Sequence, residues 1–99
     1  MAETKSIKVV QVQMNPCRKD TLKSLVNATR HLEKFSVADN IDLVIFPELG
    51  FSGYFFADGE DIGPVLEYSN EGPTFDFCSA QAIRLGSYVI CSYPEKDRL

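Results

Sequence analysis

The sequence has little of several features that would place it in a specialised class of protein. No stretch reaches the roughly 18 apolar residues of a membrane span, and the first residues lack the apolar core of a secretory signal. The three cysteines are widely spaced and odd in number, which argues against a disulfide framework, and no cluster of cysteine and histidine indicates zinc. Internal repeats and long blocks of like charge are also absent. We therefore expect no membrane partner, no metal, reduced thiols and a cytosolic or nuclear location.

The residues that are present describe an ordinary acidic globular protein. The chain has 99 residues, a net charge of −4 and a hydrophobic share of 44%, which indicates neither a disordered segment nor a nucleic-acid-binding protein. A chain of this length buries roughly two-thirds of its unfolded surface, which is enough for one core. We expect a single small domain over residues 1–99.

The most informative stretch is the apolar run from Leu43 to Phe46, which ends in Pro47 and Glu48. Consecutive bulky apolar residues predict a strand that is buried on both faces, as in parallel sheets. Pro47 ends this strand because it has no backbone N–H to donate. Glu48 therefore lies just past the carboxyl end of a strand, where open α/β sheets place their active sites. Composition alone would instead favour a solvated loop carboxylate at this position.

The flanking segments predict an α/β fold in which strands and helices alternate. The expected elements are strands over residues 7–14, 43–46 and 88–93 and helices over residues 21–35 and 73–85. Asp20 or Thr21 caps the first helix, and Gly86 ends the second. The apolar positions expected to face the core are Leu22, Leu25, Val26, Ala28, Leu32 and Phe35 in the first helix and Phe75, Cys78, Ala82 and Leu85 in the second. The connections predict parallel strands.

The segment from residue 49 to residue 73 is rich in glycine, proline and acidic residues, which predicts a long loop with one short helix near residues 65–68. Loops of this length in compact domains are usually functional. Tyr54 either walls a pocket beside Glu48 or covers the sheet edge, whereas we expect Phe55 and Phe56 to cover that edge as a small apolar cluster. Glu95 follows the third strand and Pro94, and we expect it to be a pocket-rim or structural residue. The only histidine, His31, belongs to the solvated face of the first helix.

The run Leu43-Val44-Ile45-Phe46-Pro47-Glu48-Leu49, followed by Ser52-Gly53-Tyr54, resembles the stretch that carries the catalytic glutamate in the nitrilase or carbon-nitrogen hydrolase superfamily. Residues 9–16 resemble the first strand of that superfamily and the turn after it. Shorter matches are similar in order and spacing to the branch that contains the protein amino-terminal amidase: Phe55-Phe56, Asp61-Ile62, Glu71-Gly72-Pro73 and Tyr93-Pro94-Glu95. The resemblance covers residues 7–95.

The resemblance implies a nitrilase-like α-β-β-α sandwich, of which this chain is the amino-terminal βαβαβ portion, incomplete and without the carboxyl-terminal remainder. It also implies amide hydrolysis through a thioester by a cysteine, a lysine and a glutamate, without a metal or organic cofactor. Glu48 matches the glutamate, which acts as base toward the thiol, as acid toward the departing ammonia and as base toward water. That role requires burial that raises the pKa of the carboxyl group. Tyr54 is the candidate substrate-binding residue.

The cysteine and the lysine of this mechanism have no match in the sequence. Lys96 comes too soon after the third strand, Cys78 and Cys91 lie within predicted elements, and Cys17 lies where the family places no nucleophile. A Cys17-Glu48 dyad is the local rival, although it would lack a histidine and a fixed oxyanion donor.

The resemblance implies that this chain is a fragment of an amidase that deamidates amino-terminal Asn or Gln of proteins, so the expected partners are such peptides or another small amide, and no nucleic acid. The alternative is a catalytically inactive truncated product that acts as a binding or interaction module, because an unpaired apolar strand edge can bind another chain.

Overall fold

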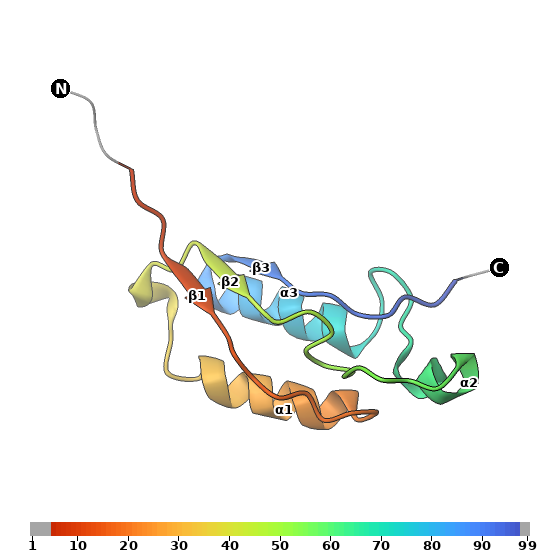
Figure 1. The fold of residues 1–99 in the computed structure, drawn as a ribbon. Helices are drawn as coiled ribbons and strands as arrows, with labels where there is room; N and C mark the ends of the chain where they lie inside the picture. Colours follow the sequence, from red (N-terminus) through yellow and green to blue (C-terminus); the bar gives the residue numbers. More distant parts are fainter. Residues whose placement is uncertain (1–4, 98–99) are drawn as a thin grey trace.

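The structure, a computed structural model, describes residues 5–97 and contains a three-stranded parallel sheet with its two long helices on one side (Figure 1). The strands β1 (Val9–Gln11), β2 (Leu43–Ile45) and β3 (Tyr88–Ile90) lie in the order β1-β2-β3. The middle residues of the strands, Val10, Val44 and Val89, are partners in the register. Because all three strands are parallel, their carboxyl ends meet at one edge of the sheet. The predicted α/β class and parallel βαβαβ order are confirmed.

Each strand ladder is three residues long and therefore shorter than its apolar run. The chain continues beyond the ladder in the same direction, since the Val12 N–H donates to the Ile45 carbonyl at 2.9 Å and the Phe46 N–H donates to the Ile90 carbonyl at 3.0 Å. Val12 and Phe46 are both buried, so the apolar run marks the core beyond the end of each assigned strand.

The two long helices connect the strands and lie side by side. The first, α1 (Thr21–Leu32), begins as predicted at Asp20, whose side chain accepts the Lys23 N–H at 3.0 Å. The second, α3 (Pro73–Leu85), begins with proline and ends at Gly86, which has a φ of 63°. Arg84 on α3 donates to the carbonyl of Leu32 at 3.0 Å, which links the two helices at the carboxyl end of α1.

The short helical turns lie earlier in the long loop than predicted. They are α2 (Gly59–Ile62) and η2 (Gly63–Val65), and a further turn, η1 (Val37–Asp39), precedes β2. The prediction of a helix near residues 65–68 was wrong in position. The helical segment begins earlier because Asp58 caps α2, where its side chain accepts the Asp61 N–H at 2.8 Å. Glu67 is instead extended and bridges to Glu95.

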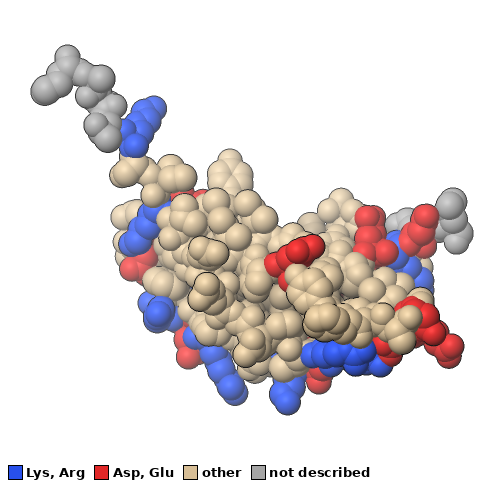
Figure 2. All heavy atoms as spheres, viewed as in Figure 1, with Lys and Arg blue, Asp and Glu red and all other residues tan. Residues whose placement is uncertain are grey.

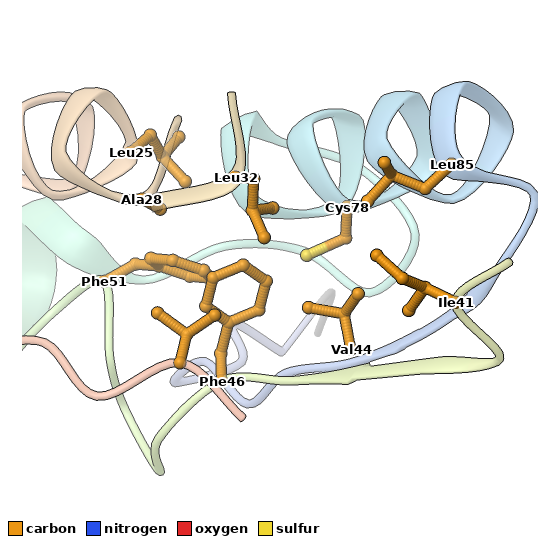
Figure 3. Packing of buried hydrophobic residues seen from close by; sticks show 10 residues of the cluster. Leu25, Ala28, Leu32, Ile41, Val44, Phe46, Phe51, Cys78 and Leu85 are labelled. Atoms are coloured by element: carbon orange, nitrogen blue, oxygen red, sulfur yellow. The ribbon is translucent and has the colours of Figure 1, made fainter. Parts of the chain in front are cut away.

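The core lies between the inner face of the sheet and the two helices. Figure 3 shows α1, α3, β2 and the loop after it directing apolar side chains toward one another. The labelled members are Leu25, Ala28, Leu32, Ile41, Val44, Phe46, Phe51, Cys78 and Leu85. Two positions expected in this face of α1 were wrong: Leu22 is 69% exposed and Val26 is 52% exposed. Both lie on the side of α1 that is directed away from the sheet and α3.

The outer face of the sheet is apolar and open. Its positions are Val9, Leu43 and Tyr88 in one row of the register and Gln11, Ile45 and Ile90 in another. Tyr88 is 82% exposed and Ile90 is 52% exposed, while the β2 positions are half-buried. Burial of β2 on both faces, which the sequence predicted, is therefore not provided by residues 5–97, because α1 and α3 cover the same face (Figure 1).

The surface in the view of Figure 2 carries Lys and Arg mainly along its lower side, over α1, while the middle of this face has few charged side chains. His31 is exposed on α1, in agreement with the solvated face predicted for it. Within residues 5–97, none of the helices is long and apolar enough to cross a membrane.

Candidate active site

The candidate active site is the turn that carries Glu48, directly beyond β2. The Gly50 N–H donates to the Pro47 carbonyl at 3.0 Å, and the Gly53 N–H donates to the Leu49 carbonyl at 3.0 Å, so the chain folds back twice within seven residues. A side chain at residue 50 would place its Cβ 3.0 Å from the Pro47 carbonyl oxygen, a contact tighter than nearly all those that Cβ atoms make, so the close approach favours glycine. Glu48 lies directly past the end of β2, as predicted, but its side chain is exposed to solvent within residues 5–97 and lacks the burial that the catalytic role requires.

Three phenylalanine rings pack together in the core next to this turn. Phe46 precedes the turn and Phe51 follows it, and their ring centroids lie 5.0 Å apart. Phe77 from α3 packs at an edge against both rings, at 5.9 Å from Phe46 and 5.8 Å from Phe51. Edge-on aromatic contacts are favourable beyond the area they bury, so this cluster fixes both ends of the turn on the core.

Two side-chain hydroxyl groups form hydrogen bonds with the backbone of the turn. The Leu49 N–H donates to Ser92 Oγ at 2.8 Å, and the Tyr54 hydroxyl donates to the Glu48 carbonyl at 2.7 Å. Leu49 has a φ of 48°, which is an unfavourable conformation for a non-glycine residue. The two hydrogen bonds hold the chain in that conformation and fix the direction in which Glu48 leaves it.

The Tyr54 side chain reaches the backbone of Glu48 through its hydroxyl and is 41% exposed. Partial desolvation, the negative charge of Glu48 and interaction with the Glu48 side chain raise the pKa of the Tyr54 hydroxyl above its ordinary value. Tyr54 therefore stays protonated and able to donate at neutral pH. Its role in substrate binding stays a prediction.

Arg18, from the turn before α1, holds the loop that follows the site. Its guanidinium donates to the carbonyls of Tyr54 at 3.2 Å and Phe55 at 2.7 Å and to the Asp61 carboxylate at 3.0 Å. The same group lies over the ring of Phe56, 5.3 Å from its centroid. The Arg18 side chain thus joins two turns that are distant in sequence.

Asp61 completes this attachment through α2. It forms ion pairs with Lys19 and Arg18 and accepts the Ala57 N–H at 2.9 Å. The hydrogen bond with Lys19, the backbone N–H of Ala57 and the charges of both basic residues lower the pKa of the Asp61 carboxyl, against a smaller opposing effect of burial. Asp61 is therefore ionised throughout the neutral range.

The expectation that Phe55 and Phe56 cover the sheet edge together is wrong for Phe55, which is 92% exposed. Phe55 has a φ of 67°, which turns its side chain away from the core. Phe56 is half-buried beneath Arg18. The loop aromatic that enters the core is Phe51, which is 1% exposed and was not singled out from the sequence.

The remaining candidates from the sequence are Cys17 and Glu95. Cys17 is half-buried against α1, where its Sγ accepts from Asn27 Nδ2 at 3.5 Å. The hydrogen bonds of residues 5–97 join the Cys17 thiol to Asn27 and not to Glu48, so the dyad stays a prediction. Glu95 lines a hollow of about 480 Å³ together with Lys96, in agreement with a place on a pocket rim.

Ser92 and Arg18 hold the turn of Glu48 and the loop after it, and the sequence did not reveal either role. Ser92 could have been found by register, since Ile45 is the partner of Ile90 and the chains after both strands run on side by side. Arg18 has no comparable signal because it acts across two irregular segments. Within the described part of the chain, no group of three or more His, Cys, Asp or Glu side chains is arranged to hold a metal ion.

Comparison with known proteins agrees with this geometry. The carbon-nitrogen hydrolase family matches residues 8–98. The protein N-terminal amidase of Saccharomyces cerevisiae is 30% identical over 95 residues, which are 93% of this chain and 21% of the amidase. A nitrilase of Pyrococcus abyssi is 32% identical over 91 residues, 92% of this chain and 34% of the nitrilase.

Solved structures of an N-terminal amidase with a Gln-Val peptide and with an Asn-Glu peptide superpose on the chain with a TM-score of 0.83. Each is 29% identical and matches 93% of this chain, which corresponds to 22% of that structure. The fold is thus the first part of a nitrilase-like domain. The chain belongs to the carbon-nitrogen hydrolase family, is related to the N-terminal amidases, and spans about a fifth of the length of those amidases.

Proposed function

We propose that this chain supplies the glutamate-bearing part of an amidase that releases ammonia from amino-terminal Asn or Gln residues of proteins. The observation that carries the proposal is the position of Glu48, on a turn held by Ser92 and Tyr54 at the carboxyl end of the central strand. The relationship to N-terminal amidases, and the solved structures of an N-terminal amidase with a Gln-Val and with an Asn-Glu peptide, support the choice of substrate.

In the proposed reaction, the Glu48 carboxylate accepts the proton of a cysteine thiol, and the sulfur forms a bond to the amide carbon. Ammonia leaves with a proton returned by Glu48, which then deprotonates the water that breaks the thioester. A lysine ammonium stabilises the negative oxygen that develops at each step. We assign the cysteine and the lysine to residues outside this chain, because Cys17 faces α1, and Cys78 and Cys91 face each other.

The proposed role also requires that another part of the hydrolase cover Glu48. A carboxylate exchanges protons with a thiol near neutral pH only when burial raises its pKa, and Glu48 is exposed among the described residues. The apolar outer rows of the sheet lie on the open side of the fold, and we propose that the remaining domain packs there.

The test is ammonia release by the full-length protein that carries these residues. Peptides that begin with Asn or Gln should be deamidated, whereas the same peptides with an acetylated amino terminus should not, because the group that pairs the free amine would be left unsatisfied. Peptides with an internal Asn or Gln are the second control. Faster release from nitriles, simple ω-amides or carbamyl compounds would overturn the substrate assignment and leave the family assignment intact.

A second function, binding without catalysis, is favoured by the exposed outer face with Tyr88 and Ile90. Its expected partner is the remainder of the hydrolase domain. Under this alternative, as under the first, the 99-residue chain alone should release no ammonia above buffer, and its unfolding should be broad or concentration-dependent. A full-length protein without amidase activity would favour the binding function. The Cys17-Glu48 dyad would instead be supported if the 99-residue chain released ammonia and the Cys17→Ala variant did not.

A further inference from the structure

Two thiols that the proposed reaction does not use meet between α3 and the chain just beyond β3. Cys78 lies on the core face of α3, and Cys91 lies two residues beyond Val89, on the same side of the extended chain. Their sulfur atoms are 3.3 Å apart, and the Cys78 thiol donates to the Cys91 sulfur. Both cysteines are free, so the structure holds a reduced pair in direct contact.

The two thiols differ in exposure. Cys78 is 9% exposed, whereas Cys91 is half-buried. Both line a hollow of about 220 Å³ that opens beside Phe75 and Tyr93. A molecule as small as hydrogen peroxide can therefore reach the Cys91 sulfur without unfolding of the helix.

The hydrogen bond between the thiols also divides the roles of the two sulfurs. It lowers the pKa of the Cys91 thiol, against opposing effects of burial and the negative charge of Glu67. The same hydrogen bond, together with burial and repulsion from Cys91 and Glu67, raises the pKa of Cys78. Cys91 is also the more exposed of the two sulfurs, so it is the one that a small oxidant in the hollow meets first.

We propose that Cys78 and Cys91 form a reversible disulfide when the chain meets a hydroperoxide. The Cys91 thiolate attacks one oxygen of the peroxide, the O–O bond breaks, and the products are a Cys91 sulfenic acid and water or an alcohol. The Cys78 sulfur then attacks the Cys91 sulfur, the S–O bond breaks, and the hydroxyl leaves as water with the Cys78 proton. The two thiols lose two electrons in total, and the peroxide gains them.

The contact needs only a small adjustment to become a bond, since the sulfur atoms of a disulfide are about 2 Å apart. The disulfide would join the middle of α3 to the chain directly before Ser92, whose hydroxyl accepts the Leu49 N–H in the turn of Glu48. The disulfide would therefore fix the position of Ser92, and through it the turn that carries Glu48. The proposal is independent of the proposed amidase activity.

The sequence allows a direct test by mass spectrometry of the 99-residue chain. Trypsin cleaves after Lys and Arg, so Arg18 and Arg84 separate the three cysteines into three different peptides. After dilute peroxide treatment and alkylation of the remaining thiols, we expect Cys17 to be alkylated and the Cys78 peptide to be linked to the Cys91 peptide. The intact chain should lose the mass of two hydrogen atoms, and dithiothreitol should restore it.

Serine variants test the order of the two steps. In Cys78→Ser, the Cys91 sulfenic acid should persist and react with dimedone, whereas in Cys91→Ser, oxidation of Cys78 should be roughly tenfold slower or more. Cys17→Ser is the matched control and should form the same disulfide as the unchanged chain. Circular dichroism would confirm that each variant is folded. If a variant does not fold, the presence or absence of the Cys78–Cys91 peptide link in the unchanged chain still tests the proposal.

Three outcomes would overturn the proposal. They are a chain that keeps all three thiols at a peroxide dose that oxidises glutathione, a disulfide that includes Cys17, and separate oxidation of Cys78 and Cys91 to sulfinic acids.

Discussion

Replacement of Phe51 by alanine tests whether the aromatic cluster holds the turn of Glu48 on the core. Phe51 is 1% exposed and packs against Phe46 at 5.0 Å and Phe77 at 5.8 Å. Removal of a buried phenylalanine ring costs about 3–5 kcal/mol, which includes the cavity left behind. Each aromatic contact accounts for about 0.5–1.5 kcal/mol of that loss.

The expected loss is large compared with the whole stability of such a chain. At about 0.05–0.15 kcal/mol per residue, a complete domain of this length would be stable by about 5–15 kcal/mol, and this chain, whose outer sheet face is open, should lie at or below the low end of that range. Phe51→Ala should therefore shift the urea midpoint strongly or abolish the cooperative transition. Phe55 is the matched control, because it is the same residue type in the same loop but 92% exposed. Phe55→Ala should change the free energy of unfolding by no more than about 0.5 kcal/mol.

Urea unfolding followed by far-ultraviolet circular dichroism measures both variants at several protein concentrations. A loss below about 1 kcal/mol for Phe51→Ala would refute the inferred burial of the ring. Equal losses for the two variants would mean that Phe55 packs as the sequence predicted, and that the loop has a different arrangement.

Three further predictions concern the active-site turn and its attachment. In the full-length protein, Glu48→Gln should lower turnover about a thousandfold or more with little change in KM, whereas exposed Glu33→Gln should not, as steady-state kinetics will show. Gly50→Ala should cost about 1–3 kcal/mol because the new Cβ would lie 3.0 Å from a carbonyl oxygen. Gly59→Ala in α2 meets no atom within 4 Å and should stabilise by about 0.5–1 kcal/mol, so thermal melts of the two should shift in opposite directions. The lowered pKa of Asp61 makes its ionised form stabilising above the unfolded pKa, and that contribution is lost as the pH falls below about 4. Asp61→Asn should thus flatten the acid side of a plot of urea midpoint against pH, and an unchanged slope would contradict the ion pairs.

The sequence predicted the position of Glu48 because the features that fix it are local. The run from Leu43 to Phe46 is apolar without interruption, and Pro47 ends it, so the next residue leaves the sheet at its carboxyl edge. Both long helices were predicted for the same reason, since Asp20 and Gly86 are residues that start and end helices.

The features that the sequence did not reveal depend on contacts between distant segments. Phe51 and Phe55 have the same chemistry and lie in one irregular loop, where no periodicity separates the ring that is buried from the ring that is exposed. Ser92 contacts Leu49 only because β2 and β3 are neighbours in the sheet, and Arg18 reaches the loop from the opposite end of the chain. Each of these contacts requires the complete fold.

The attachment of the Glu48 turn to Ser92 also sets the order of events as the chain is made. The strand order β1-β2-β3 allows β1, α1 and β2 to assemble as soon as residue 45 is available, whereas the acceptor for the Leu49 N–H appears only with residue 92. At about 5–20 residues per second, the ribosome adds that residue roughly two to nine seconds after Glu48. A β3 strand that docks slowly would leave the Leu49 N–H without its Ser92 acceptor for longer, even in a chain whose first helix and strands are already native. Glu48 is therefore synthesised early and positioned late.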